Sequence, residues 1–186
     1  MLPLIFLTSA AINNNLGPDP AVRLARETGE WSMRLLLLTL AMSPLKQLTR
    51  SSQWLQYRRI LGLLTFFYAC AHLAIYCLFI LALEWNQLRV EILERPYITV
   101  GFFAWLILLP LALTSTRSWQ RRLGRRWSRL HQWVYLSTFL SLMHLIWQIR
   151  SDISEALVYT FLFLLLMSFR REKLFSSFTY FRRRGD

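Results

Sequence analysis

Residues 60–83 read ILGLLTFFYACAHLAIYCLFILAL. These 24 residues contain no Asp, Glu, Lys or Arg, and a single histidine, His72, lies near their middle. An α-helix rises about 1.5 Å per residue, so about 20 apolar residues cross a hydrocarbon core about 30 Å thick. This segment is therefore long enough to span a membrane as one helix.

Other segments repeat this pattern along the chain. Residues 97–116 and 130–149 are each 20 residues long without an acidic or basic side chain. Residues 30–48 can span if Arg34 extends to the interface, and residues 153–169 are short but very apolar after Glu155. We expect an all-α integral membrane protein, a single domain over residues 1–186, whose bundle of about six transmembrane helices covers about 1–13 (partial), 30–48, 60–83, 97–116, 127–149 and 153–169.

The N-terminal segment is the least regular of these spans. Its apolar run covers only residues 1–12, too few to cross a bilayer as a straight helix. We expect it to be the end of a first span whose beginning is missing. The alternative is the apolar core of a signal peptide, but no basic residue precedes the run.

The charged residues predict how the chain threads. Residues 43–59 and 117–129 carry +4 and +6 without one acidic residue, and the tail from residue 170 carries +4. Residues 13–30, 84–95 and 150–155 each sum to −1. Basic short loops stay in the cytoplasm, so we expect the three basic segments, including the C-terminus, on the cytoplasmic side.

The composition also excludes several classes of protein. The formal net charge is +12, but positive-inside topology and contact with anionic membrane lipid account for it, so we expect no nucleic-acid partner. The three clear spans hold no Asp or Glu, so the usual polar relay of a proton or cation transporter is missing. Cys70 and Cys77 lie seven residues apart on one helix, too far to form a disulfide. We detect no nucleotide-binding fingerprint, zinc motif or nucleophile elbow, and no internal repeat.

All three histidines, His72, His131 and His144, fall within predicted spans. Ionisable residues at membrane depth usually face the bundle interior or a ligand, and histidine is a common axial ligand of haem iron. The alternative is a neutral histidine hydrogen-bonded to a neighbouring helix. His72 lies 13 residues past Arg59 and His144 lies 15 past Arg129, so their depths differ by about 3 Å. We predict that these two histidines bind one haem from both sides.

His131 lies 13 residues before His144, or about 20 Å nearer the cytoplasm. We expect it to ligate a second centre with an incomplete ligand set, or to lie beside another cofactor such as a flavin. On an ideal helix His131 and His144 point roughly 140° apart, so facing one seam requires local rewinding. Several arginines can pair with haem propionates or a flavin phosphate, or can simply set the topology: Arg58, Arg59, Arg121, Arg122, Arg125 and Arg126.

Several short stretches, in this order and spacing, are similar to the MsrQ (formerly YedZ) family of haem-binding membrane subunits, within the ferric-reductase-like transmembrane group. The resemblance covers roughly residues 10–172. The matching stretches are GPDP (17–20), LLTLAMSPL (37–45), RRILGL (58–63), Phe67-Tyr68 leading to His72-Leu73, RPYITVG (95–101), LALTST (111–116), LGRRW (123–127), Leu130-His131, Val134-Tyr135 and His144.

The resemblance implies a multi-pass protein of the bacterial cell inner membrane that carries haem b and is associated with FMN. Its three family histidines fall on His72, His131 and His144. Such subunits pass electrons from the quinone pool, or from a flavin reductase, to a periplasmic molybdopterin-containing reductase subunit (MsrP-like), which repairs oxidised methionines. The chain would then be an electron-transfer subunit and not itself an enzyme. The family has a full first span, where this sequence has only about a dozen residues.

Two alternatives remain at this point. A stand-alone membrane ferric or quinone reductase would be an enzyme, but it needs a nucleotide-binding domain or a dedicated partner. A structural or transport bundle without a cofactor would show no haem absorption. In the preferred hypothesis electrons enter near His131 and leave near the His72–His144 haem.

Overall fold

The computed structural model describes residues 17–149 and 153–169, together with Ser9 and Asn13. Apart from these two positions, the predicted partial first span lies outside the described residues, as does the basic tail from residue 170. Every regular element in the described part is helical, which confirms the predicted all-α class. In chain order the elements are α2 (Pro20–Thr49), α3 (Trp54–Ile75), the π-helical η1 (Tyr76–Ile80), α4 (Trp85–Glu94), α5 (Pro96–Leu113), α6 (Arg117–Leu123), α7 (Arg125–His131), α8 (Val134–Gln148) and α9 (Ser154–Ser168).

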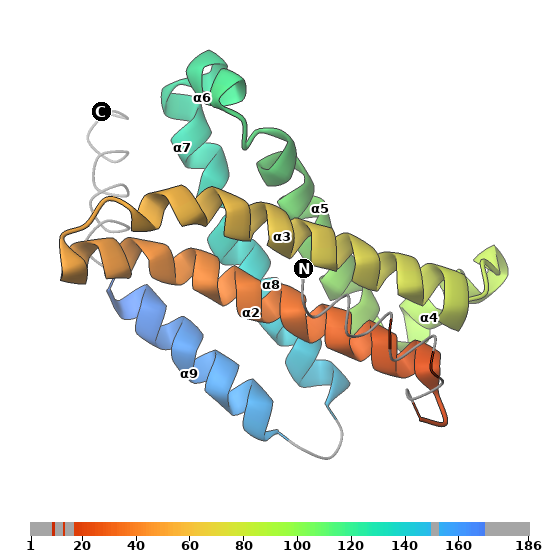
Figure 1. Ribbon diagram of the computed structural model, residues 1–186. Helices are drawn as coiled ribbons and strands as arrows, with labels where there is room; N and C mark the ends of the chain where they lie inside the picture. Colours follow the sequence, from red (N-terminus) through yellow and green to blue (C-terminus); the bar gives the residue numbers. More distant parts are fainter. Residues whose placement is uncertain (1–8, 10–12, 14–16, 150–152, 170–186) are drawn as a thin grey trace, which may run out of the picture.

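Helices α2 and α3 form a long antiparallel hairpin (Figure 1). The Asp19 carboxylate accepts the backbone N–H of Val22 and Pro20 is the first helical residue, a combination that favours a helix start. The helix ends at Thr49, where the next residue, Arg50, has a left-handed φ of 55°. Helix α2 therefore begins ten residues before the predicted span at residue 30.

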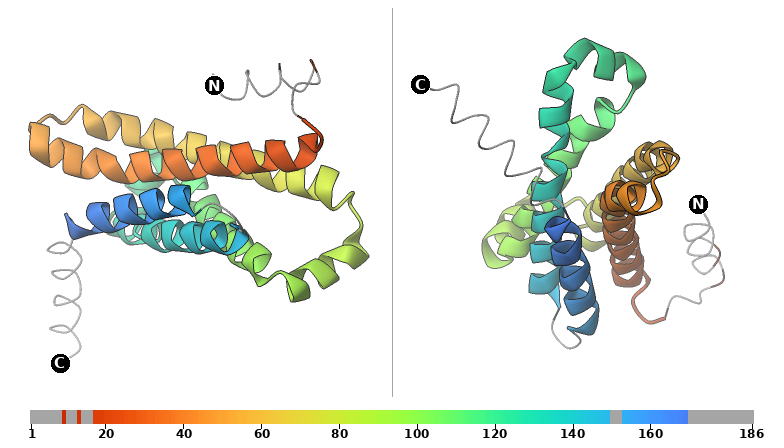
Figure 2. Two further views of the ribbon diagram at one scale, coloured as in Figure 1. Left: turned by 90° about the horizontal axis from the view of Figure 1, so that it is seen from below. Right: turned by 90° about the vertical axis from the view of Figure 1, so that its left-hand side faces the viewer.

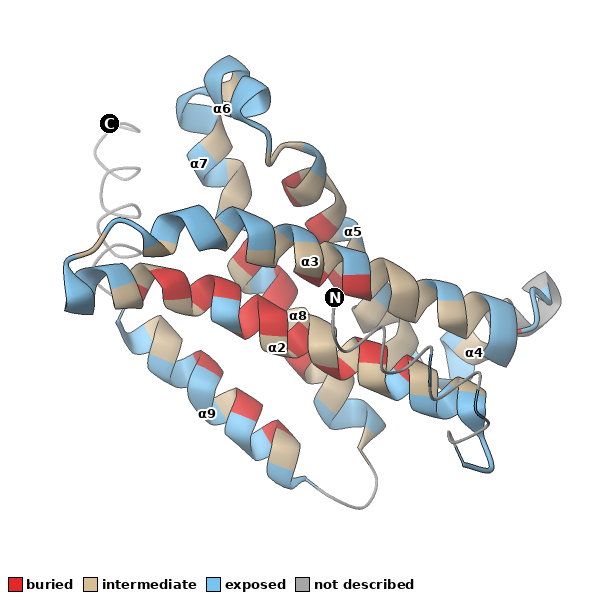
Figure 3. Cartoon of the chain, viewed as in Figure 1, coloured by how far each residue is buried: buried red, intermediate tan, exposed pale blue. Residues whose placement is uncertain are grey.

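The helices pack in two layers (Figure 2). The α2–α3 hairpin forms one layer, and α5, α8 and α9 form the other. Leucines of α2, α5 and α8, including Leu36, Leu108 and Leu142, meet in the core between them. Figure 3 shows buried residues on the facing sides, while large apolar side chains such as Phe103 and Phe161 lie exposed on the outside. An exterior rich in large apolar side chains is typical of a surface that contacts lipid.

Two helices are long and apolar enough to cross a membrane: residues Trp54–Ile80, which join α3 to η1, and Pro96–Leu113. Helix α9 is apolar but shorter, with 15 residues. The six spans assigned from the sequence stay a prediction, because helix bounds alone do not place a bilayer. Helices α6 and α7 project beyond the layers at one end of the bundle, next to the ends of α5 and α8 (Figure 1).

The segment predicted as one span over residues 127–149 is divided in two. Helix α7 ends at His131, and α8 begins at Val134. Between them the amide nitrogens of Gln132, Trp133 and Tyr135 bond to carbonyls three residues back, at 3.1 Å each. Such bonds tighten the helix locally into a 3₁₀ turn. The structure thus contains the local rewinding that the 140° offset between His131 and His144 required.

Arg34 does not depend on reaching the interface, contrary to the expectation for span 30–48. Its guanidinium lies 2.8 Å from the Glu30 carboxylate and 3.8 Å from Glu155, and its Nε donates to the Tyr159 hydroxyl at 2.9 Å. Arg26 contacts the other oxygen of Glu30 at 2.8 Å. Pairing of this kind neutralises charge within a bundle, so the network joins α2 to α9 and makes Arg34 compatible with an apolar surrounding.

Glu30 is the centre of this network, and its removal is expected to destabilise the fold. The Glu30 side chain is 10% exposed, whereas the side chains of Arg34 and Arg26 are 32% and 70% exposed. Breaking a fully buried pair costs about 3–5 kcal/mol, so we expect Glu30→Ala to lose roughly 2–3 kcal/mol with a partly exposed partner. Unfolding by SDS in detergent micelles measures this loss. Arg26→Ala is the control, since an exposed i,i+4 pair contributes about 0.3–0.5 kcal/mol. Equal losses for the two variants would contradict a central role for Glu30.

Candidate functional site

His72 of α3 is fixed against α2. Its Nδ1 lies 2.7 Å from the carbonyl oxygen of Ala25. A carbonyl oxygen can only accept, so Nδ1 carries the proton and donates it, and the lone pair of the neutral ring lies on Nε2. The ring also packs on the backbone of Gly29, where a Cβ atom would lie 3.1 Å from Nδ1. The helix pair therefore orients His72 with Nε2 as its metal-binding nitrogen.

His144 of α8 is held in the same way against α5. Its Nδ1 donates to the carbonyl oxygen of Tyr97 at 2.7 Å. The ring packs so closely on Gly101 that a Cβ there would lie 2.7 Å from Nδ1 and 2.9 Å from Cε1. Only glycine leaves room for the ring, and Nε2 again has the lone pair.

These two arrangements reveal a structural repeat that the sequence analysis did not detect. Adding 72 to the residue numbers converts the first histidine, its carbonyl partner and its glycine into the second set. The same shift relates a second pair of positions: Ser32 Oγ donates to the Thr65 carbonyl at 3.2 Å, and Ser137 Oγ donates to the Ala104 carbonyl at 2.9 Å. The α2–α3 and α5–α8 hairpins are therefore equivalent units. Few letters coincide between them, which hid the repeat: Gly29 with Gly101, Leu64 with Leu136, Phe67 with Phe139, His72 with His144 and Leu73 with Leu145.

The two histidine rings face each other across the repeat. Their centres are 6.1 Å apart and their planes are 78° from parallel. Histidine nitrogens bind metals at roughly 2.0–2.1 Å, and with about 1.2 Å from each nitrogen to its ring centre, two opposed ligands have centres roughly 6.4 Å apart. The observed separation therefore fits one metal ion between the two Nε2 atoms. The prediction that His72 and His144 lie at one depth agrees with this geometry.

Sequence reasoning missed the groups that hold these rings. The carbonyls of Ala25 and Tyr97 leave no signature in side-chain chemistry. The Tyr97 ring also lies 5.8 Å from the His144 ring, measured between centres. One signal was present: each histidine follows a glycine by 43 residues. That spacing could have paired Gly29 and Gly101 with the two histidines.

His131 has a different environment. Its Nε2 lies 3.1 Å from Thr114 Oγ1, and that hydroxyl also lies 2.6 Å from the Pro110 carbonyl. Because the carbonyl takes the hydroxyl proton, the Thr114 oxygen accepts from Nε2–H of His131. The Trp127 ring stacks on the imidazole at 4.0 Å between centres. The nitrogen that His72 and His144 keep for a ligand is thus occupied in His131.

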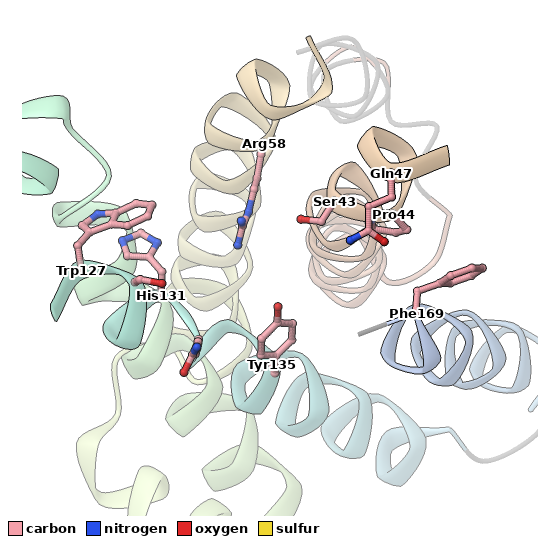
Figure 4. A pocket seen from close by; sticks show the side chains of 10 residues that line it. Ser43, Pro44, Gln47, Arg58, Trp127, His131, Tyr135 and Phe169 are labelled. Atoms are coloured by element: carbon pink, nitrogen blue, oxygen red, sulfur yellow. The ribbon is translucent and has the colours of Figure 1, made fainter. Parts of the chain in front are cut away.

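The six candidate arginines are not gathered at one site. Arg58 lines a cavity of about 290 Å³ together with His131 (Figure 4). The others lie exposed on α3, α6 and α7, and Arg122 packs over the Trp119 ring at 5.6 Å. The exposed members are Arg59, Arg121, Arg122, Arg125 and Arg126.

A helical bundle with two facing histidines is the arrangement expected of a haem-binding membrane domain. Residues 28–142 match the family model described as "Ferric reductase like transmembrane component". The chain is 48% identical over 162 residues to "Protein-methionine-sulfoxide reductase heme-binding subunit MsrQ" of Xanthomonas campestris pv. campestris (strain B100), which covers 87% of this chain and 74% of the relative. It is 47% identical over the same shares to the protein of that name from Xanthomonas oryzae pv. oryzae (strain MAFF 311018). No solved structure matches the chain.

The class is therefore a ferric-reductase-like transmembrane protein. Within that class the chain belongs to the MsrQ family, as the sequence resemblance predicted. It is accordingly an integral membrane protein, and its exposed apolar side chains face lipid.

Proposed function

We propose that this chain is a haem b-containing electron-transfer subunit of the bacterial inner membrane, with His72 and His144 as the axial ligands. The 6.1 Å separation of the two imidazole centres carries the proposal, because it suits one iron held from both sides. The relatives' printed name, heme-binding subunit, agrees with this assignment. Bound haem would supply one-electron redox chemistry.

The protein's own contribution is to hold the ligands. The Ala25 and Tyr97 carbonyls fix the tautomer of each imidazole and raise its basicity through the Nδ1–H bond. Gly29 and Gly101 let each ring approach the neighbouring helix backbone. Because the two hairpins repeat the same design, both ligands are oriented before any metal binds.

The flow of electrons follows from the proposed topology. The two histidines lie near the ends of α3 and α8 that face away from the basic segments, so they lie toward the periplasm if those segments and the C-terminus are cytoplasmic. Electrons would come from the quinone pool or a flavin reductase, with FMN as an associated cofactor. They would leave to a periplasmic molybdopterin-containing reductase subunit that repairs methionine sulfoxide. Substrate turnover would belong to that partner.

Reoxidation of the reduced protein tests the function. The dithionite-reduced chain, freed of excess reductant, is mixed with the periplasmic reductase and a methionine sulfoxide substrate, or with ferric chelates alone. We expect rapid loss of the reduced absorption bands with the reductase and substrate, and slow loss with the chelates. Rapid reoxidation by chelates without the reductase would favour the stand-alone ferric reductase instead. Absence of any haem absorption would leave a bundle without a cofactor.

A further inference from the structure

The cavity beside His131 lies between both layers of the bundle, at the end where the basic segments meet (Figure 4). Its volume of about 290 Å³ is at the lower end of the range of roughly 300–1,000 Å³ for small-molecule sites. Side chains from α2, α3, α7, α8 and the residue after α9 line it: Ser43, Pro44, Gln47, Arg58, Trp127, Ser128, His131, Gln132, Tyr135 and Phe169.

Two observations argue against a second iron at this cavity. The Nε2 of His131 is occupied by Thr114, and Trp127 covers a face of the ring. The structural repeat also supplies no opposing ligand, because the position 72 residues before His131 is Arg59, which is exposed. The two-sided grip formed by His72 and His144 has no equivalent here among the described residues.

The lining favours a flat ligand that accepts hydrogen bonds. Arg58 extends from α3 toward the cavity and offers up to five N–H donors, and the amides of Gln47 and Gln132 offer more. Trp127, Pro44 and Phe169 provide apolar surfaces on which a ring can pack. Donors around an apolar slot are suited to a ring with carbonyl oxygens at its edge.

We propose that His131 is not an iron ligand and that its cavity binds the oxygen-bearing ring of a small redox carrier, a quinone or a flavin. Arg58 is the principal hydrogen-bond donor to the ring oxygens, and Trp127 and His131 form one wall. The site deepens the proposed function, on which it rests, because a carrier bound here would deliver electrons to the iron between His72 and His144. Its position near the cytoplasmic end separates the entry of electrons from their exit.

Direct binding to the full-length protein in detergent tests this site. Ubiquinone-1 and FMN are titrated separately by calorimetry, and these two arms distinguish the sources of the ring. We expect one of them to bind with one ring per chain. Arg58→Gln should weaken that binding at least tenfold, as the loss of a charge-assisted hydrogen bond predicts. Arg59→Gln removes the same charge from the next, exposed position and should leave binding within about twofold of the unsubstituted protein.

Haem content gives a second, independent readout. His131→Ala and the more conservative His131→Gln should retain the haem content and the absorption spectrum of the unsubstituted protein while weakening ring binding. Loss of haem from either variant that still elutes as a folded species would overturn the inference. Equal weakening by Arg58→Gln and Arg59→Gln would also overturn it, as would failure of both probes to bind. Failure of the proposed function itself is distinguishable, because it would appear as a missing haem spectrum in the unsubstituted protein.

Discussion

Replacing His144 with alanine is expected to abolish the six-coordinate haem spectrum of the purified protein, and His72→Ala is expected to do the same. Each imidazole supplies one of two opposed ligands, and their ring centres are 6.1 Å apart. Removing either ring leaves one axial position to water or to none, so haem content should fall to near zero after detergent extraction. The Soret and α bands of the reduced protein, and haem per chain, measure the change.

Free imidazole provides a stringent check on this result. The His144→Ala variant keeps the Tyr97 carbonyl and the glycine surface of Gly101, which together orient the native ring. Imidazole added during haem loading can donate to that carbonyl and present its other nitrogen to iron. We expect partial recovery of the bis-imidazole spectrum. An unchanged spectrum in either alanine variant before any addition would show that the ligand pairing is wrong.

The depth of the two histidines could be predicted because helix geometry is regular. Spans that start at the same membrane face advance by about 1.5 Å per residue, so counting from the flanking arginines places His72 and His144 at one level. The apolar runs predicted the helical class for the same reason. Helix ends were less predictable: Asp19 and Pro20 start α2 well before the hydrophobic stretch, and the turn at residues 132–133 is set by backbone hydrogen bonds.

The supporting contacts could not be predicted from residue types. The acceptors for both Nδ1 protons are backbone carbonyls, which every residue has. The pairing of Arg34 with Glu30 and Tyr159 depends on how α9 packs against α2, and that packing brings together positions 125 residues apart. The sequence distinguished neither Arg58 from Arg59 nor His131 from the other histidines. Those distinctions need the direction of each side chain, which only the packed bundle fixes.

The glycines make the orientation of the ligands testable without touching a histidine. A Cβ at residue 101 would lie 2.7 Å from Nδ1, 2.9 Å from Cε1 and 3.0 Å from Cγ of His144. The ring cannot stay in place with an added methyl group, because its Nδ1–H bond to Tyr97 holds it against the backbone. Changes in groups that orient a metal ligand typically lower affinity about 10- to 100-fold, and we expect Gly101→Ala to weaken haem binding by this amount.

Two matched substitutions make this prediction quantitative. At Gly29 a Cβ would lie 3.1 Å from His72 Nδ1, a smaller overlap, so Gly29→Ala should weaken haem binding less than Gly101→Ala. At Gly62 the nearest atom to an added Cβ is Thr39 Cγ2, at an ordinary 3.8 Å. Gly62→Ala should leave haem binding unchanged and stabilise α3 by roughly 0.5–1 kcal/mol, since alanine is the better helix former. Haem titration of the three apoproteins ranks them, and equal affinities for Gly101→Ala and Gly62→Ala would show that close packing on the α5 backbone does not position His144.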